Sequence, residues 1–442
     1  MLFGGSLPYY RKELQQGRKT KGLGMETNSR GDGMKRHLIV VIGTYDTKAE
    51  EHIFLHNAIK QRGLTPLTIN VGTGGPCQAR VDYDLYPELL GSSPESCKSR
   101  DRAISEMISM ASGLVQRLHR EQGISGIISA GGGSGTHITA SIMRTLPMGI
   151  PKLIVSTVAS RDMKPVIGTK DITVMHSVVD LLGINSVSGK VLDKAAAAIS
   201  AMAQSQWEPS ETKSRIALTL FGFITPAAEF ARRELENMGY EVVPFHANGT
   251  GGMAMEALAK EGYFDGILDL ATHELADELK NGYCSGIGPN RLEPITSPQP
   301  IPRLVIPGGL DCAVLEFTRD TVPEEYKGRK IFYYDFRSAV RLSQEETIVI
   351  AEQLAEKLSK APNYCKVLIP LHGWSEADKE GAPLFDPELN ALFVRTLKKR
   401  LGSTIEIKEA PYHINDPAFA RMAAEILHNM ITVTSTLPAS GP

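Results

Sequence analysis

Several features that would assign a protein to a familiar class are missing from this sequence. Its five cysteines are scattered and never form a CxxC pair, so neither a disulfide framework nor a zinc ribbon is expected, and the pattern is typical of a reducing compartment. No 18 apolar residues run together, and the N-terminal segment lacks the apolar stretch of a signal peptide. Both absences argue against a membrane or secreted protein. We therefore expect a cytoplasmic protein.

A strong net charge and a lysine-bearing phosphate loop are also missing. Lys+Arg 48 against Asp+Glu 50 leaves a formal net charge of -2, so no overall field attracts nucleic acid or an anionic membrane, and neither is an expected partner. The patterns GxxxxGKS and GxxxxGKT do not occur, which argues against a P-loop NTPase. Any polyanion must be held at a local site.

Glycine is the residue type in modest excess. The 442 residues include 41 glycines, about 9% against a usual ~7%. The excess gathers in short clusters that follow apolar, β-branched runs. Glycine has no Cβ, so a backbone rich in it can approach a neighbour or a ligand closely.

Apolar runs alternate with amphipathic stretches of helical length along the whole chain. Runs at 37–42, 67–71, 126–129 and 152–156 predict the strands of one unit, and the pattern restarts with runs at 215–220 and 241–245. This alternation predicts an α/β fold of two doubly wound, mostly parallel, Rossmann-like domains. The expected boundaries are a disordered basic tail at 1–35, an N-terminal nucleotide-binding domain at 36–205, a linker at 206–213, a C-terminal domain at 214–435 and a tail at 436–442.

The glycine clusters of the first domain fall at predicted strand ends. Small residues there leave backbone N–H groups free, and the N-terminus of a following helix adds partial positive charge, which together favour phosphate. Lys48 could add a charge to the same anion, and Asp46 could hold Mg²⁺ or a ribose hydroxyl. The predicted nucleotide-binding residues are Gly43, Thr44, Asp46, Lys48, Gly72, Gly131, Gly132, Gly133, Ser134, Gly135, Thr136, Ser156 and Thr157.

Polar residues in the second domain offer a different chemistry. His246, His413 and Asp416 could provide acid–base catalysis or ligate a divalent ion, although Asp416 is more simply a helix cap. The run from Gly249 to Ala254 fits GxGxxA but follows the second predicted strand of its domain, not the first. A dinucleotide fingerprint is therefore not expected, and a ligand site or close packing both stay open for these glycines.

Motifs spread in order along the chain resemble a known family. They are Ile42–Lys48, Gly131–Thr136, Ile154–Ser160, Ser177–Asp180 with Gly183–Asn185, Phe245–Gly252 and Pro411–Asp416. With these motifs the sequence resembles the ATP-binding family of the plant tobamovirus-resistance protein, an inhibitor of viral RNA replication, and looks like a fungal or bacterial-type member.

The resemblance implies two α/β domains, ATP in the glycine loops of the first, and self-association into homodimers or larger homo-oligomers. The viral helicase target of the plant protein is not carried over, because its recognition depends on surface loops. Two functions remain open. One is a nucleotide-binding protein, regulatory or scaffolding; the other is a metabolic enzyme, a hydrolase, a lyase or ATP-dependent, with a second site in the C-terminal domain at an interdomain cleft.

Overall fold

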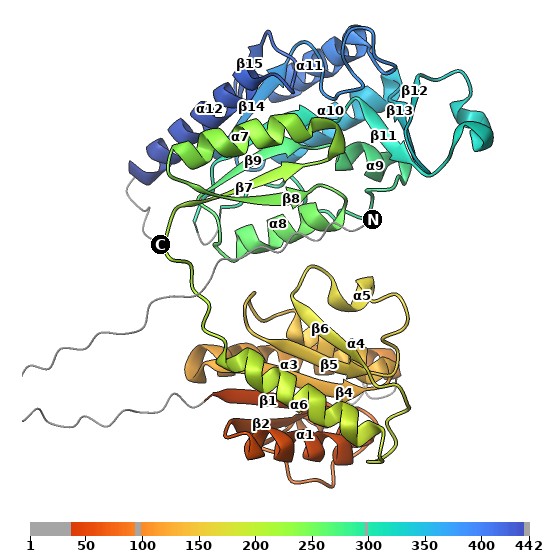
Figure 1. Ribbon diagram of the computed structural model, residues 1–442, viewed down its shortest axis with the longest axis vertical. Coiled ribbons are helices and arrows are strands. Elements are labelled where there is room, and N and C mark those ends of the chain that lie inside the picture. Colours follow the sequence, from red (N-terminus) through yellow and green to blue (C-terminus); the bar gives the residue numbers. More distant parts are fainter. Residues whose placement is uncertain (1–36, 93–98, 297–298, 437–442) are drawn as a thin grey trace, which may run out of the picture. The chain divides into compact units, whose positions relative to one another are not determined.

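Two parallel sheets of six strands, each with helices on both faces, are the centres of two domains in the described part of the chain (Figure 1). The computed structural model describes residues 37–92, 99–296 and 299–436, so the tails expected at 1–35 and 436–442 lie outside it, apart from Thr436. All neighbouring strands within each of the two sheets run parallel. The predicted fold class is confirmed.

The first domain has the strand order β3-β2-β1-β4-β5-β6. Its strands are β1 (Leu38–Gly43), β2 (Thr65–Asn70), β3 (Tyr83–Asp84), β4 (Ile124–Gly131), β5 (Lys152–Ser156) and β6 (Ile172–His176). Its helices are α1 (Ala49–Gln61), α2 (Tyr86–Ser92), α3 (Arg100–Gln122), α4 (Gly133–Met143), α5 (Lys164–Ile167) and α6 (Ser188–Gln204). One apolar core joins α3 and α4 to the sheet, and a second joins α1 and α6 to its other face. Strands such as β1 are therefore buried throughout, which explains their unbroken apolar sequence.

The second domain has the strand order β15-β14-β10-β9-β7-β8, and an irregular segment separates α6 from β7. The sheet consists of β7 (Arg215–Leu220), β8 (Glu241–His246), β9 (Gly266–Ala271), β10 (Arg303–Gly308), β14 (Cys365–Pro370) and β15 (Glu406–Ala410). The helices are α7 (Thr225–Asn237), α8 (Thr250–Lys260), α9 (Glu274–Lys280), α10 (Gln344–Leu358), α11 (Pro387–Leu401) and α12 (Pro417–Thr436). The helices α7 and α12 share one core with the sheet, and α9, α10 and α11 share another.

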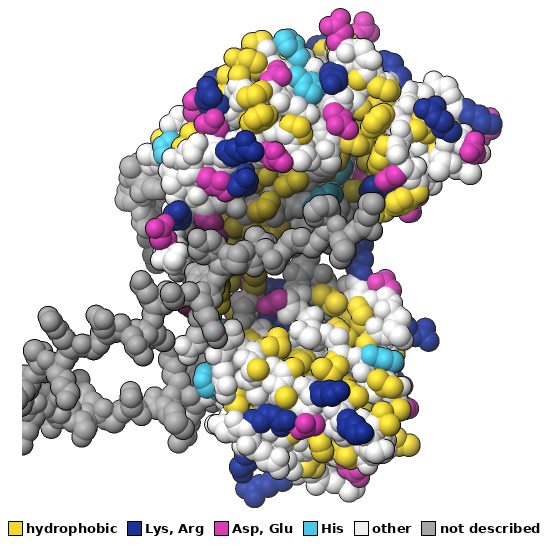
Figure 2. Space-filling view, viewed as in Figure 1, with side chains coloured by type: hydrophobic (Ala, Val, Ile, Leu, Met, Phe, Trp, Pro, Cys, Tyr) yellow, Lys and Arg dark blue, Asp and Glu magenta, His cyan; other side chains and the backbone are white. Residues whose placement is uncertain are grey.

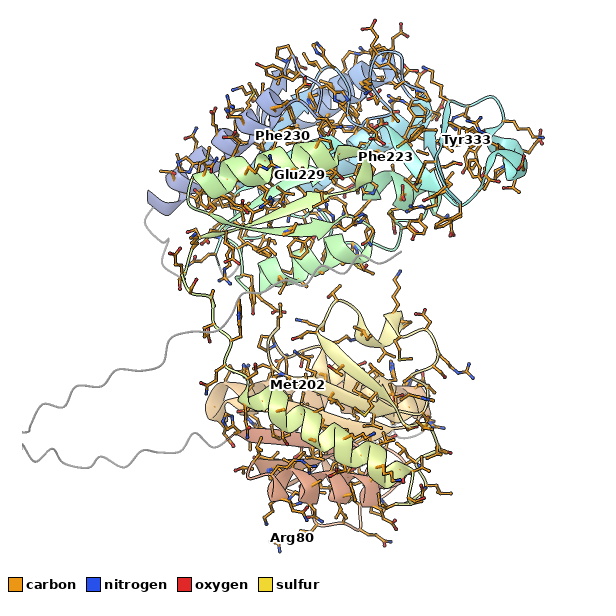
Figure 3. The ribbon with its side chains drawn as sticks, viewed as in Figure 1. Arg80, Met202, Phe223, Glu229, Phe230 and Tyr333 are labelled. Carbon is orange, nitrogen blue, oxygen red and sulfur yellow. The ribbon has the colours of Figure 1, made fainter. Side chains whose placement is uncertain are left out.

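A small antiparallel sheet is inserted in the second domain. It contains β11 (Cys312–Leu315), β12 (Ile331–Tyr333) and β13 (Ser338–Arg341). Phe223, which lies between β7 and α7, packs edge-on against Phe332 at 5.4 Å and Tyr334 at 5.2 Å between ring centroids; Phe223 and Tyr333 are labelled in Figure 3. Aromatic contacts thus anchor the insertion to the start of α7.

The described surface and helices match two expectations from the sequence, a nearly balanced charge and the lack of a long apolar run. On the face shown in Figure 2, basic and acidic side chains are interspersed on both domains. Within the described ranges, no helix combines the length and the apolar character needed to cross a bilayer.

Candidate functional site

The first sheet reverses its direction of winding between β1 and β4. From β1 the strands continue to β2 on one side, and from β4 they continue to β5 on the other. Open parallel sheets bind ligands outside the carboxyl ends of the two strands at such a switch point. Gly43 ends β1, Thr44 follows it and Gly131 ends β4, so the topology gathers predicted site residues from distant parts of the sequence.

The N-terminus of α4 faces this switch point with free backbone donors. Gly132 is the N-cap, with an extended backbone and no side-chain capping bond. The first intrahelical bond runs from Thr136 N to Gly132 O at 2.8 Å, so the N–H groups of Gly133, Ser134 and Gly135 have no acceptor within the helix. We call Gly132–Gly135 the phosphate cradle. The sequence predicted a loop here, and most of it is instead the first turn of a helix.

Two glycines at this helix start have different roles. A Cβ on Gly131 would lie 3.3 Å from Gly135 Cα, so Gly131 allows strand and helix to approach closely. A Cβ on the exposed Gly133 would meet only Val158 Cγ1, at 3.9 Å. Gly133 therefore leaves open space in front of the free donors.

Hydroxyl groups from neighbouring strand ends surround the cradle. Thr44 Oγ1 lies 3.8 Å from the position of a Cβ on Gly135, and Thr157 Oγ1 lies 3.7 Å from that of Gly132. Thr136 and Ser156 instead bond to each other, with 2.8 Å between their hydroxyl oxygens, and both are buried. Thr44 and Thr157 thus border the phosphate cradle, and we call these two residues its rim. Thr136 and Ser156 are buried beneath the cradle.

The basic side chain at the cradle is Arg100, which the sequence analysis missed. Its Nη2 donates to Ser134 Oγ at 3.2 Å. Arg100 is the first residue of α3, where a cation opposes the helix dipole, and this unfavourable placement was the available signal. Lys48, the predicted cation, donates from its ammonium group to the carbonyl of Leu181. Its charged end therefore contacts the segment that follows β6 and not the cradle.

Asp46 and Gly72 lie together on the β2 side of β1. A Cβ on Gly72 would come within 2.4 Å of Asp46 Oδ1, and Gly74 N donates to Asp46 Oδ2 at 2.8 Å. The carboxylate therefore ties the loops after β1 and β2 together. Within the described residues no group of three or more His, Cys, Asp or Glu side chains is placed to hold a metal. An Mg²⁺ carried by a nucleotide would need only one or two carboxylates besides phosphates and water.

A buried histidine lies beneath the switch point. His52 Nδ1 is 2.7 Å from Lys48 O, and Ala130 N donates to its Nε2 at 3.4 Å. Burial lowers the pKa of His52 to about 4, so the ring is neutral and joins the start of α1 to the end of β4. A Cβ on Gly43 would fall 1.8 Å from His52 Nε2, which explains the glycine at the end of β1.

The structure does not unite the three residues predicted as catalytic in the second domain. His246 ends β8, one edge strand, while His413 and Asp416 follow β15, the opposite edge. Five strand spacings separate these edges, about 24 Å. His246 therefore cannot act on the same atom as the other two.

Both ring nitrogens of His413 already bond to the main chain. Asn415 N donates to Nδ1 at 3.2 Å, and Nε2 lies 3.0 Å from Ser375 O. Because Nδ1 accepts from Asn415 N, Nε2 is the nitrogen that faces the Ser375 carbonyl as a donor. His413 N donates to Asp416 Oδ2 at 2.8 Å, so Asp416 holds the turn that leads into α12. In this geometry both residues stabilise a turn.

A pocket of about 820 Å³ lies beside this turn. Besides His413 and Asp416, its lining includes His372, Glu376 and Lys379. His372 is exposed, and its ring has no hydrogen-bond partner among the described residues. Its imidazole is thus available to hydrogen-bond with a bound molecule.

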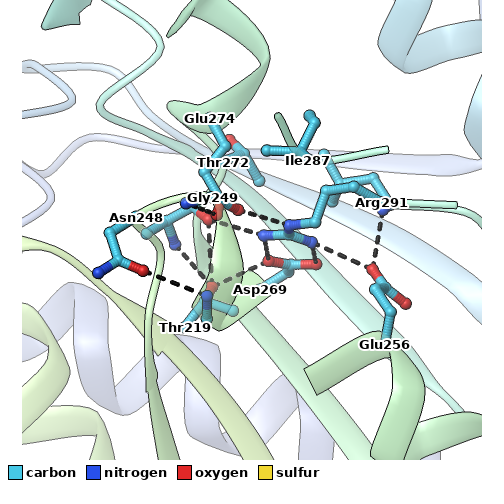
Figure 4. A network of polar contacts seen from close by, with 12 residues as sticks. Thr219, Asn248, Gly249, Glu256, Asp269, Thr272, Glu274, Ile287 and Arg291 are labelled. Carbon is cyan, nitrogen blue, oxygen red and sulfur yellow. Dashed lines mark hydrogen bonds and ion pairs between the residues drawn. The ribbon is translucent and has the colours of Figure 1, made fainter. Parts of the chain in front are cut away.

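A buried ionic network underlies the start of α8 (Figure 4). Arg291, from the irregular segment before β10, donates to Glu274 at 2.6 Å, to Asp269 at 2.6 and 2.7 Å and to Glu256 at 3.3 Å. Arg303 donates to Glu256 at 2.6 Å. Burial would raise the pKa of Asp269, but Arg291 and then Arg303 outweigh it and hold that pKa below its usual value.

This network decides between a ligand site and close packing, the two roles left open for Gly249, Gly251 and Gly252. A Cβ on Gly252 would lie 2.4 Å from Glu274 Oε2 and 2.7 Å from Arg291 Nε. A Cβ on Gly251 would lie 1.9 Å from His246 O. The glycines are needed because the first turn of α8 packs directly on the network and on β8, so close packing explains them.

A second buried histidine stands at the switch point between β7 and β9. His273 stacks on Phe221 with 3.9 Å between ring centroids. Neither of its ring nitrogens has a hydrogen-bond partner in the described structure. Burial, followed by the charges of His246 and Arg291, lowers the pKa of His273 to about 3, so this ring is neutral.

Comparison with known proteins identifies relatives for both domains. The model described as "Uncharacterised protein family (UPF0261) N-terminal domain" matches residues 37–208, and that of the C-terminal domain matches residues 213–431. A UPF0261 protein of Clostridium tetani is 41% identical over 402 residues, 89% of this chain and 98% of the relative.

A plant protein and a solved structure are more distant. The ToMV resistance protein Tm-1(GCR237) of Solanum lycopersicum is 33% identical over 415 residues, 86% of this chain but 54% of the plant protein, so this chain spans about half the plant protein's length. A UDP-N-acetylglucosamine 2-epimerase structure aligns with 92% of this chain and 100% of its own at 11% identity, with a TM-score of 0.23. A score this low carries no argument about function.

Proposed function

This chain belongs to the UPF0261 family, and from that premise and the geometry at the β1/β4 switch point we propose that its N-terminal domain binds a nucleotide, ATP, with the phosphates on the N-terminus of α4. The observation that carries the proposal is the uncapped first turn of α4, which opens onto free space at Gly133. The N–H groups of the cradle and the partial positive charge of the helix end suit a phosphate.

Side chains around the cradle support the same ligand. Arg100 brings a guanidinium group to Ser134, and guanidinium groups bind phosphate through paired charge-assisted hydrogen bonds. Thr44 and Thr157 add hydroxyl donors at the rim. Asp46, on the β2 side, is the carboxylate proposed for a ribose hydroxyl or a nucleotide-bound Mg²⁺.

The choice of ATP among nucleotides comes from the family resemblance in the motifs. That resemblance also supports self-association into a homodimer or larger homo-oligomer, and the cysteine pattern supports a cytoplasmic location. A regulatory or scaffolding role is the simplest form of the proposal, because the described groups of the cradle and its rim are backbone N–H and hydroxyl donors suited to binding a phosphate.

Calorimetric titration with ATP and with inorganic triphosphate tests the cradle. In Gly133→Val the new side chain fills the space before the donors, and its Cβ clashes with nothing, so the fold should persist while both probes bind at least about tenfold more weakly. The matched control is Gly113→Val, on the exposed face of α3, where a Cβ meets nothing within 4 Å. Equal binding by both variants, or no binding by the wild type, would refute the proposal.

A second candidate function is an enzyme that uses the C-terminal domain. The pocket at His372 favours it, because this ring is free whereas the ring of His413 is not. ATP turnover in the presence of a metabolite mixture should then fall in His372→Gln and persist in His56→Gln, a control on α1. Turnover that is absent, or that is the same in both variants, contradicts an enzyme of this kind.

A further inference from the structure

Exposed apolar side chains gather in one segment of the N-terminal domain. Four of the seven large apolar residues exposed in its described part lie within residues 178–187, namely Val178, Leu182, Ile184 and Val187, with exposed fractions of 65%, 86%, 40% and 40%. We call residues 178–187 the apolar segment. Clusters of exposed apolar side chains mark binding surfaces more often than scattered ones do.

The segment begins with a strained residue. Val178 has φ +67°, a conformation that β-branched residues rarely adopt. Ser177 holds it in place, because Ser177 N donates to Ser156 O at 3.1 Å and Ser177 Oγ donates to Val179 O at 2.6 Å. Strain that surrounding bonds maintain is concentrated at ligand clamps and active sites.

Two further bonds fix the rest of the segment to α1. Gly183 N donates to Glu51 Oε1 at 2.9 Å, and the ammonium group of Lys48 donates to Leu181 O. Leu182, between these two anchors, faces solvent, with 86% of the residue exposed. The segment is therefore held in position while its apolar side chains stay uncovered.

The apolar segment lies on the same edge of the sheet as the phosphate cradle. Ser156 pairs with His176 across β5 and β6, so Val178 follows β6 two strand spacings, ~10 Å, from the end of β4. Thr157, between them, borders Gly132. On the opposite side, after β1 and β2, the large apolar residues Tyr45 and Val71 are buried, and Asp46 accepts a hydrogen bond from Gly74 N.

We propose that the side chains of Val178 and Leu182 form the binding site for the nucleotide base. The inference rests on the proposed function, because it needs the phosphates on α4. A ribose then bridges from the cradle past Thr157 to the apolar segment, and the base covers side chains that otherwise face water. The strain at Val178 presents its side chain to the base.

The test compares ATP with inorganic triphosphate, which has no base. Val178→Gly suits φ +67° and should keep or raise Tm, and Leu182→Ser changes an exposed side chain and should leave Tm unchanged. Both should weaken ATP binding at least about fivefold and leave triphosphate binding unchanged. Val178→Asn, which also tolerates this φ, should behave like Val178→Gly. The matched control is Ile53→Ser, an exposed apolar residue on α1.

Other outcomes overturn the inference in distinguishable ways. Unchanged ATP binding in Val178→Gly and Leu182→Ser removes the base from this segment. Equal losses for ATP and triphosphate show that the segment serves the phosphates or the fold. A Leu182→Ser variant that loses oligomeric mass by light scattering and keeps its ATP affinity shows that the surface joins copies of the chain. If triphosphate fails to bind the wild type, or binds Gly133→Val equally well, the proposed function fails and this inference fails with it.

Discussion

Replacing Arg100 with glutamine is expected to weaken phosphate binding, and replacing Lys48 with glutamine is not. Arg100 reaches the cradle through Ser134 at 3.2 Å, whereas the ammonium group of Lys48 bonds to the carbonyl of Leu181. From the sequence alone, Lys48 is the expected cation at the phosphates. The two variants therefore test whether Lys48, expected from the sequence, or Arg100, expected from the structure, is the cation at the phosphates.

The magnitude follows from the exposure of Arg100. A charge-assisted hydrogen bond contributes about 1.5–3 kcal/mol, but Arg100 is exposed, and solvent and salt reduce the effect to about 1 kcal/mol. That free energy corresponds to a loss of about fivefold in affinity. The loss should shrink as salt rises, because the screening length is only ~10 Å at 0.1 M ionic strength.

Calorimetric titration with inorganic triphosphate at two salt concentrations measures the effect. Lys48→Gln should bind triphosphate like the wild type but melt at a lower temperature, because the Leu181 carbonyl loses its donor. If Lys48→Gln loses more triphosphate affinity than Arg100→Gln, the assignment of the cation from the structure is wrong.

Three further predictions concern stability. Gly43→Ala places a Cβ 1.8 Å from His52 Nε2 and should lower the free energy of unfolding by about 3 kcal/mol; a urea midpoint equal to that of the wild type would show that His52 can move aside. The pKa of His273 is lowered to about 3, below its ordinary value near 6.5, so its contribution to stability is complete above about pH 6.5 and is lost as pH falls toward 3. Urea midpoints between pH 7 and 4.5 should therefore fall less steeply in His273→Phe, and equal slopes would contradict this. Arg291→Met leaves buried carboxylates without their main partner and should cost about 3–5 kcal/mol in urea unfolding, so a loss below 1 kcal/mol would mean that Arg303 or water compensates.

The α/β architecture could be predicted because its signals are local. The run expected as a strand at 152–156 is β5 (Lys152–Ser156), and that at 215–220 is β7 (Arg215–Leu220). Strands buried on both faces must be apolar throughout, and this leaves a clear pattern in the sequence. Glycine clusters at strand ends were recognisable for the same reason, since the chain must turn closely there.

The candidate site was predicted in part. Gly132, Gly133, Thr44 and Thr157 do meet at the switch point, because carboxyl ends of parallel strands share one edge of the sheet. The loop expected at 131–136 is mainly a helical turn, because Gly133–Thr136 already have helical backbone. His52 was missed, since a lone histidine in a helical stretch gives no signal of what it will contact.

By itself, the sequence determined the two doubly wound domains and the places where glycine lets backbone approach closely. Those properties follow from backbone preference and from the periodicity of burial, which act over a few residues. The tertiary structure decided which side chains meet. It placed Arg100 at Ser134, 34 positions away, and Lys48 at Leu181, 133 positions away, and it set Arg291 beneath the glycines of α8. Such meetings depend on the strand order and on how helices cross the sheet, and no short stretch of sequence contains that information.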